Sequence, residues 1–419
     1  MSMITKCKNI IKKIRIIYLP LQIIKRAITQ LIYSFDLWIY NLPTKNKKDT
    51  NNLINNIIQN AVPKAIGFEY EKIKQETLAC VKGLKTDAKI YNYKFSSSQQ
   101  KENLYSSVYA LLIYDLYDEV KNLSENDKKE WVDYLDSFQN KNDGLWYDEN
   151  LRNEHYNDSD WWGARHLAIH IIAAYTALGT KPKYNIEYVE KYYNLDYFKN
   201  WLDKTDWESF MDHSNDIDNK IMNIGVVLQY QRDFLENEKA KIAIEFLYEY
   251  LDSKKNKDTG MWGKCNISNP YELSRTVQFS YHLYMLYFYD KKEIEAKDKI
   301  VELTLKTQNK LGGFGLKLNS SACEDIDSVE LLLYLSEENN DEVEQAIKKA
   351  FAWIISNQNK DGGFVFRRNE SLWYGHDILL AKQEESMMLA MWFRTLSILK
   401  ITKFLNIKNN YNYTSVPGY

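Results

Sequence analysis

The chain has 419 residues, of which 45% are apolar and 27% charged, a composition typical of globular proteins that excludes a disordered one. Its formal net charge of −2 gives no overall basic character, which excludes nucleic acid as an expected partner. The four cysteines are scattered without a Cys-x-x-Cys pair, so we expect no disulfide framework and a reducing compartment.

Residues 1–35 carry seven cations and no acid: Lys6, Lys8, Lys12, Lys13, Arg15, Lys25 and Arg26. The uncharged run between them, Ile16 to Ile24, is too short to span a bilayer. A basic, apolar helix of this kind suits an anionic membrane surface, although it could instead pack on the protein with its cations in water. We therefore expect a cytoplasmic protein that is peripheral to the inner face of the membrane.

We divide the chain into three parts. Residues 1–60 comprise the basic segment and a linker rich in Asn and Lys, residues 61–405 form the main domain, and residues 406–419 form a C-terminal tail.

Four similar turns recur along the main domain, each with a glycine followed by an aromatic residue: SFQNKNDGLW (137–146), SKKNKDTGMW (253–262), KTQNKLGGF (306–314) and SNQNKDGGF (356–364). Glycine suits a helix end that requires positive φ. The spacing from Gly144 to Gly260 is about twice that between the later turns, so a degenerate copy is expected at 200–210. One more unit fits around 102–120. The repeat thus predicts about six helical hairpins.

The second helix of each later hairpin is predicted at 162–178, 218–235, 271–289, 325–336 and 384–404. A single hairpin cannot bury its apolar faces alone, but stacked neighbours can. We therefore predict an all-α fold, an (α/α)6 toroid of inner and outer helices around a central cavity, spanning about residues 100 to 405.

The sequence QNKDGGF, followed by a loop and a helix, resembles the repeat of squalene–hopene cyclases and of protein prenyltransferase β-subunits. The cyclases protonate their substrate with a D-x-D-D-T-A motif, and the nearest stretch here is CEDIDSVELL (323–332). One alignment places Asp327 at the proton donor and Ser328 at the last Asp. Another leaves Ile326 at the donor. The resemblance implies isoprenoid chemistry, with one carboxylate of the motif missing in either alignment.

The prenyltransferases hold zinc with Asp, Cys and His. Asp325, Cys323 and His376 lie near the matching repeats, but Met388 stands where the zinc histidine of the last helix would fall. We therefore do not expect zinc, because a catalytic site needs three convergent ligands. Mg²⁺ is expected only if the substrate is a diphosphate.

Acidic residues also gather between each turn and the helix that follows it. Most of them can be explained as helix caps. The stretches 211–219 and 323–327 hold more acids than one helix start can use. In a toroid these loops would open at one end of the ring. The candidate catalytic residues are Glu324, Asp325, Asp327 and His282, and the candidate substrate-binding residues are Asp158, Asp160, Trp162, His166, Asp212, His213, Asp216, Tyr281 and Trp373. His166 and His170 are spaced as a core pair rather than a metal site.

Three functions remain open. The first is a membrane-associated toroid enzyme, similar to terpene cyclases or prenyltransferases, that acts on an isoprenoid or another lipid-linked substrate. The second is a carbohydrate-active toroid, a lyase or hydrolase. The third is a toroid that binds a small-molecule ligand or acts as a scaffold without chemistry.

Overall fold

The computed structural model describes residues 70–151, 162–207, 216–407 and 414–418. All of them belong to one unit of the chain, Ile54–Tyr419. The basic segment 1–35, for which we expect membrane contact, lies outside the described residues. Within the part of the chain that is described, no helix is long and apolar enough to cross a membrane.

Within the described residues, this unit contains six hairpins of an outer and an inner helix. In chain order they are α3 (Tyr70–Gly83) with α4 (Leu104–Leu116), α5 (Glu125–Phe138) with α7 (Ala164–Ala177), α8 (Leu195–Leu202) with α9 (Ile217–Phe234), α10 (Glu238–Lys254) with α11 (Pro270–Tyr289), α12 (Lys297–Leu305) with α13 (Ala322–Leu335), and α14 (Asp341–Ser356) with α15 (Met388–Phe404).

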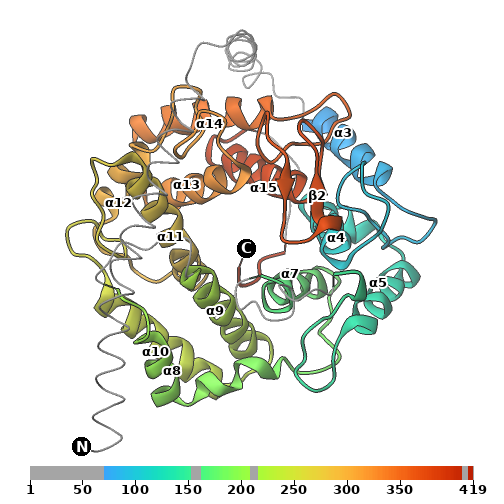
Figure 1. The fold of residues 1–419 in the computed structure, drawn as a ribbon, viewed down its shortest axis with the longest axis horizontal. Coiled ribbons are helices and arrows are strands. Elements are labelled where there is room, and N and C mark those ends of the chain that lie inside the picture. The colour runs from blue at the N-terminus through green and yellow to red at the C-terminus, as the bar shows by residue number, and fades with distance from the viewer. Residues whose placement is uncertain (1–69, 152–161, 208–215, 408–413, 419) are drawn as a thin grey trace, which may run out of the picture. The chain divides into compact units, whose positions relative to one another are not determined.

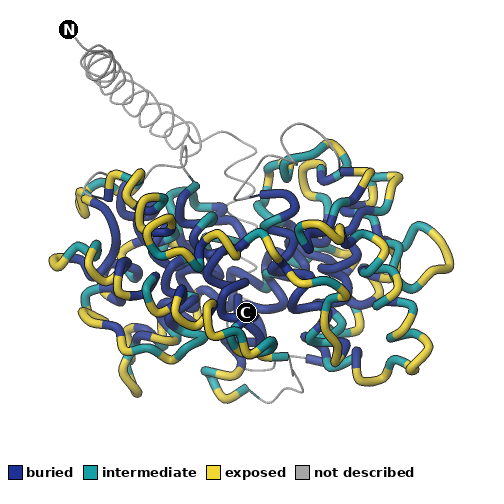
Figure 2. Tube along the Cα trace, turned by 90° about the horizontal axis from the view of Figure 1, so that it is seen from below, coloured by how far each residue is buried: buried dark blue, intermediate teal, exposed yellow. Residues whose placement is uncertain are grey.

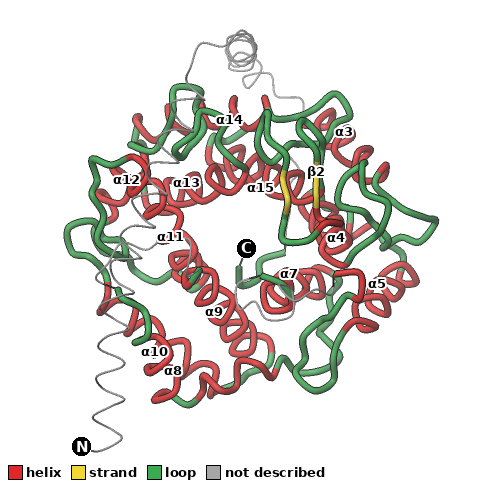
Figure 3. Tube along the Cα trace, viewed as in Figure 1, coloured by secondary structure: helices red, strands yellow, loops and turns green. Residues whose placement is uncertain are grey.

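The inner helices form a closed ring. Helices α4, α7, α9, α11, α13 and α15 each contact the next, and α15 contacts α4 to complete the circle (Figure 1). The first helix of each hairpin lies outside this ring (Figure 3). The predicted all-α toroid is therefore confirmed, although its first hairpin begins at Tyr70 rather than near residue 100.

Short elements complete the described chain. They are the 3-10 helices Val120–Asn122, Glu149–Leu151, Glu187–Tyr193 and Asp377–Leu379, and the antiparallel strands β1 (Leu372–Trp373) and β2 (Leu380–Ala381).

Burial separates the two layers of helices. Inner helix α4 is buried without interruption from Leu104 to Ile113, whereas outer helix α10 buries one stripe and exposes its opposite face. Figure 2 shows the same division, with buried chain in the middle and exposed chain at the periphery. An inner helix contacts neighbours on every side, so it has no face that can carry a solvated charge stripe. Charged groups on these helices therefore need a partner or a function.

The repeated turns are held by their glutamine and glycine residues. Gln308 Nε2 donates to the Gly312 oxygen at 2.9 Å and to the Ala346 oxygen at 2.8 Å, tying its turn to α14. Gln139 bridges its own turn to the Tyr184 oxygen in the same way. The turn glycine with positive φ is Gly312 (97°), not Gly313, whose added Cβ would lie 1.9 Å from Ser320 Oγ. Gly312 thus provides the positive φ of the turn, whereas Gly313 leaves room for the Ser320 side chain.

Candidate functional site

Polar and aromatic side chains meet inside the ring near one end of the inner helices. Each hairpin reverses the chain, so the inner helices run in the same direction. The first two turns of α4 and α7 contribute Tyr105 and His166, whose Oη and Nδ1 atoms are 3.0 Å apart. The start of α9 contributes Asp218, whose Oδ2 lies 2.9 Å from Nδ1 of His282 on α11. The closed ring therefore gathers residues that are far apart in sequence.

Asp327 on α13 is a buried carboxyl group with no hydrogen-bond donor among the described residues, and only 4% of it is exposed. Burial raises its pKa to about 8; the positive charge on His282 opposes this, while Glu330 and Glu324 reinforce it. At neutral pH the Asp327 carboxyl group is consequently mostly protonated. It is an acid that has no structural bond to satisfy.

His282 contacts a second carboxylate, Asp218, and lies within electrostatic reach of Asp327. Asp218 is 1% exposed and contacts both His282 and Arg275, whose Nη2 lies 3.4 Å from Asp218 Oδ2. Burial alone would raise the pKa of Asp218, but Arg275 and His282 together lower it to about 2. Burial would lower the pKa of His282, but the hydrogen bond to Asp218 and the charge on Asp327 raise it. The imidazole side chain remains 19% exposed. One group here is thus a carboxylate and another a carboxylic acid, with an ionisable imidazole within electrostatic reach of both.

A neutral aromatic wall occupies the side of the ring formed by α4, α7 and α15. The centroids of its aromatic side chains lie close together: Tyr105 and Trp162 are 5.7 Å apart, Tyr109 and Trp392 are 5.2 Å apart, and His166 and His170 are 4.6 Å apart. Burial and, to a lesser extent, the charge on His282 lower the pKa of His166 to about 3. The wall therefore carries no net charge at neutral pH, and His166 lies within electrostatic reach of His282.

Asp325 occupies a different environment from Asp327. Its oxygens accept hydrogen bonds from Phe314 N (2.9 Å), Ser320 Oγ (2.7 Å), Trp353 Nε1 (2.9 Å) and Arg394 Nη1. These donors come from the turn, from α14 and from α15. The contacts favour a structural role for Asp325 in place of the catalytic role expected from the sequence.

Glu324 is also used by the fold. Its Oε2 accepts from the backbone N–H of Ser321 at 2.8 Å and pairs with Arg367 Nη2 at 2.7 Å. It completes the capping box of α13. The excess of acid in 323–327 is therefore divided between a cap, a buried ion pair and the unpartnered Asp327.

The remaining predicted residues have different positions. Asp158, Asp160, Asp212 and His213 lie outside the described residues. Asp216 stands at the start of α9 in a left-handed conformation, with φ of 42°. Tyr281 is buried on α11 and bonds to Glu330, and burial raises its pKa well above the usual value.

Trp373 lies apart from this cluster. It is 53% exposed on β1, and its indole N–H donates to Asp377 Oδ1 at 3.1 Å.

Sequence reasoning did not single out Arg275 or Tyr105, and it included Asp218 only as one acid of the stretch 211–219. Arg275 and His282 are seven residues apart on one helix, a spacing that places them on the same face. This spacing could be read from the sequence, whereas the contact between α9 and α11 could not.

The residues proposed by resemblance for zinc do not fit a zinc site. Asp325 is bound by its four donors, and His376 Nδ1 accepts the N–H of Ile378 at 3.2 Å. Burial raises the pKa of Cys323 well above the usual value, which makes loss of its proton unfavourable. Within the described residues, no group of three His, Cys, Asp or Glu side chains could hold a metal ion.

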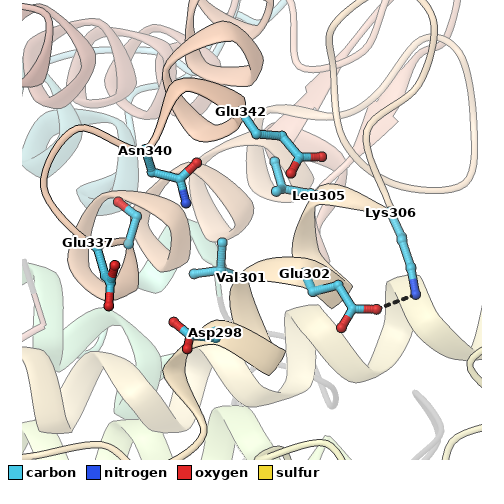
Figure 4. Close-up of a pocket in the computed structure, with 9 residues that line it drawn as sticks. Asp298, Val301, Glu302, Leu305, Lys306, Glu337, Asn340 and Glu342 are labelled. Atoms are coloured by element: carbon cyan, nitrogen blue, oxygen red, sulfur yellow. Dashed lines mark hydrogen bonds and ion pairs between the residues drawn. The ribbon is translucent and has the colours of Figure 1, made fainter.

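A separate cleft of about 460 Å³ lies on the outer surface, between α12 and the segment joining α13 to α14 (Figure 4). Its lining includes Asp298, Glu302, Glu337 and Glu342, and Lys306 pairs with Glu302 at 2.5 Å. None of the candidate site residues lines this cleft.

Comparison with solved structures finds similar folds at low identity. A type II terpene cyclase from Scytonema has a TM-score of 0.46 and 10% identity, over 81% of this chain and 98% of its own. A GH76 α-mannanase from Bacteroides thetaiotaomicron has a TM-score of 0.44 and 11% identity, and the match covers 81% of this chain and 98% of that chain. An ent-copalyl diphosphate synthase from Streptomyces platensis has a TM-score of 0.37 and 12% identity, and the match covers 70% of this chain and 50% of that chain. This chain therefore spans about half the length of the synthase, and likenesses this distant carry no inference about activity.

The comparison with curated proteins finds no match. The family model of the prenyltransferase alpha-alpha toroid domain matches residues 32–197, 81–268, 221–372 and 268–406. These overlapping matches follow the hairpins around the ring and leave only the two ends of the chain uncovered. The chain therefore belongs to the prenyltransferase alpha-alpha toroid domain family.

Proposed function

We propose that this protein is an enzyme that holds an isoprenoid or another lipid-linked apolar substrate inside the ring. Asp327 begins the reaction by protonating a carbon–carbon double bond. The observation that carries this proposal is the state of Asp327, a buried carboxylic acid with a pKa of about 8 and no hydrogen-bond donor among the described residues. A general acid must hold its proton at the working pH and be free to release it to the substrate.

The proposed step moves the Asp327 proton to one alkene carbon and leaves a carbocation at the other. A second double bond of the substrate can attack that cation and close a carbon–carbon bond. Loss of a proton to a base ends the sequence. Tyr105, Tyr109 and Trp392 offer their ring faces to the migrating positive charge, and the neutral histidines of the same wall add no repulsion.

We assign His282 the role of returning a proton to Asp327. Asp218 accepts the hydrogen bond of Nδ1, which leaves Nε2 as the atom able to exchange a proton. The ionised Asp218 raises the pKa of His282, and the partly exposed imidazole can take a proton from water. Arg275 keeps Asp218 ionised, so it acts through Asp218 rather than on the substrate.

A carbohydrate-active enzyme is the second candidate. Asp218 and Asp327 have pKa values shifted in opposite directions, the combination that glycoside hydrolysis requires of its base and its acid. However, Asp218 is 1% exposed and already bonded to His282 and Arg275, so it has little access to water or sugar. The aromatic wall and the burial of Asp327 favour an apolar substrate.

We also propose that residues 1–35 bind the anionic inner face of the membrane and thereby bring the ring to its substrate. The support is the charge pattern of that segment, which lies outside the described residues. Lipid-linked substrates reside in the membrane, so a protein that uses them benefits from staying there.

The test uses deuterium. The protein is incubated in D₂O with prenyl alcohols, prenyl diphosphates and manno-oligosaccharides, and products are analysed by mass spectrometry. We expect an isoprenoid product with one deuterium at a new C–H bond. Asp327→Asn should lower its rate by about 10² or more, whereas Asp298→Asn, an exposed acid of the surface cleft, should not change it. Full activity of Asp327→Asn would refute the proposal, and cleavage of the oligosaccharides would support the second candidate.

A further inference from the structure

A buried ion pair among the inner helices has no part in the mechanism described so far. Glu330 on α13 is 4% exposed, and its Oε1 lies 2.6 Å from Nζ of Lys400 on α15. Tyr281 on α11 hydrogen-bonds to the same carboxylate. Helices α11 and α15 are the two inner helices that flank α13 (Figure 1). The Glu330 carboxylate is therefore contacted by both inner neighbours of its own helix.

Glu330 follows Asp327 by about one helical turn. Residues three apart lie on the same face of a helix, with Cβ atoms about 5–6 Å apart. The charge on Glu330 also reaches Asp327, since it contributes to the raised pKa of that carboxyl group. An opposite charge favours the ionised form of a carboxyl group, whereas burial favours the neutral form. One face of α13 thus carries a carboxylic acid and, one turn further along, a carboxylate paired with a lysine.

The other acids near Asp327 already have contacts that leave little room for a substrate. Glu324 completes a helix cap, Asp325 is held by four donors, and Asp218 is bonded to a histidine and an arginine. Glu330 lies in the middle of α13, so it is needed neither to cap the helix nor to hold a turn. A buried ion pair adds little net stability compared with apolar side chains of similar size, so stability alone does not account for it.

We propose that Glu330 is the base that ends the reaction begun by Asp327. This assignment rests on the function proposed above and supplies the base that it requires. A C–H bond next to the cationic carbon breaks, its electron pair forms a carbon–carbon double bond, and the proton bonds to a Glu330 carboxylate oxygen. The substrate gains one proton from Asp327 and loses one to Glu330, so the product is an isomer of the substrate. Glu330 then releases its proton to water as the product leaves.

A carboxylate with a lysine partner is strong enough for this step. A carbocation is a far stronger acid than any carboxylic acid, so a weak base can take its proton when the two are in contact. The ion pair with Lys400 keeps Glu330 in the charged form before the substrate arrives. The acid and the base therefore differ because one of two neighbouring carboxyl groups has a cationic partner at ion-pair distance.

The experiment compares the products of two variants. Glu330→Gln removes the base but leaves Lys400 buried without its partner, so a double variant, Glu330→Gln with Lys400→Met, removes the whole pair. Each is incubated in D₂O with prenyl alcohols and prenyl diphosphates, and products are identified by mass spectrometry. We expect the ratio of alkene to alcohol product to fall by about tenfold or more, because water captures the cation that Glu330 no longer deprotonates. Deuterium at the new C–H bond should persist.

Glu324→Gln is the matched control. Like Glu330, Glu324 belongs to an ion pair, here with Arg367, and its charge raises the pKa of Asp327. A structural or purely electrostatic role changes the amount of all products together, so Glu324→Gln should keep the wild-type ratio of alkene to alcohol. Glu330→Asp, which retains a carboxylate, should keep the alkene as its main product.

The outcomes separate the base from the acid. An unchanged product ratio in both Glu330 variants, with deuterium incorporation still dependent on Asp327, would overturn the assignment of Glu330 and leave the acid in place. A wild type that forms only the deuterated alcohol would overturn it as well. If the wild type forms no deuterated isoprenoid product, the proposed function and the assignment of Glu330 both fail.

Discussion

Asp325 and Asp327 lie two residues apart on α13, yet their surroundings give them opposite roles. Asp325 is held by four donors that include the fully buried Arg394, whereas Asp327 has none among the described residues. Residues two apart on a helix point in different directions. The Asp325 side chain therefore contacts α14 and α15, whereas the Asp327 side chain lies within electrostatic reach of His282 on α11. Two acids of the same type in one motif thus separate into a group held by the fold and the group that we propose as the acid.

The raised pKa of Asp327 predicts a pH-dependent stability. The carboxyl has its ordinary pKa of 3.8 when unfolded and about 8 when folded, so the folded protein holds a proton that the unfolded chain releases. The stability from this group is fully present below pH 3.8 and is lost as pH rises through about 8, by up to about 1.4 kcal/mol per pH unit. Asp327→Asn does not titrate. Its thermal midpoint should therefore rise relative to the wild type between pH 5 and pH 9, as measured by circular dichroism.

Asp325→Asn provides the matched comparison for this measurement. It leaves Arg394 buried beside a neutral side chain, and loss of one partner of a buried ion pair typically costs about 3–5 kcal/mol. We expect a lower thermal midpoint at both pH values. Equal effects of the two substitutions would contradict the separate roles that we assign to the two carboxylates.

At the scale of elements, the repeated turn explains how each outer helix is tied to the next unit. Gln139 and Gln308 each donate to two backbone oxygens, one in their own turn and one in the following unit. Lys255 occupies the equivalent position in the second of the four matching turns and pairs with Asp252 at 2.7 Å instead. The glutamine therefore contributes to packing between neighbouring hairpins, and not only to helix termination.

Gln308→Ala tests this contribution. It leaves the Gly312 and Ala346 oxygens without their donor, so we expect a loss of about 1–3 kcal/mol in the free energy of unfolding. Urea unfolding followed by circular dichroism gives the value. Lys310→Ala, an exposed neighbour in the same turn, should change it by less than about 0.5 kcal/mol. A Gln308 variant as stable as the Lys310 variant would show that the bridge adds nothing.

At the scale of the whole molecule, closure of the ring is what assembles the candidate site. Helices α15 and α4 are separated by most of the chain, yet their contact completes the aromatic wall through Tyr109 and Trp392. The segment 414–418 then returns to α4 and α9. The two ends of the described chain therefore both contribute to the interior.

The basic segment 1–35 gives a prediction at this same scale. Replacement of Lys12, Lys13 and Arg15 by Glu removes three cations and adds three acids, so the segment should lose its attraction to anionic lipid. We expect the wild type to co-sediment with vesicles that contain phosphatidylserine, and the triple variant to remain in the supernatant. Vesicles of phosphatidylcholine alone serve as the control. Equal sedimentation of both proteins would argue against membrane binding through this segment.

The sequence by itself determined the ring, because the repeat is local. A glycine turn after each helix and an apolar face on each hairpin can be read from neighbouring residues, and stacking follows from the need to bury those faces. It also pointed to 323–327, where three acids lie too close together for one helix cap. It misplaced the start of the first hairpin because α3 is followed by a loop that does not carry the turn motif.

Only the tertiary structure decided which acid is held by hydrogen bonds and which has a raised pKa and no donor among the described residues. The difference between Asp325 and Asp327 depends on Arg394, Trp353 and His282, which lie on three other helices. The Asp218–His282 bond and the docking of Thr414 on Asp115 likewise join residues from distant parts of the chain. The pKa of a carboxyl group is determined by its burial and by nearby charges, and both depend on which helices become neighbours when the ring closes.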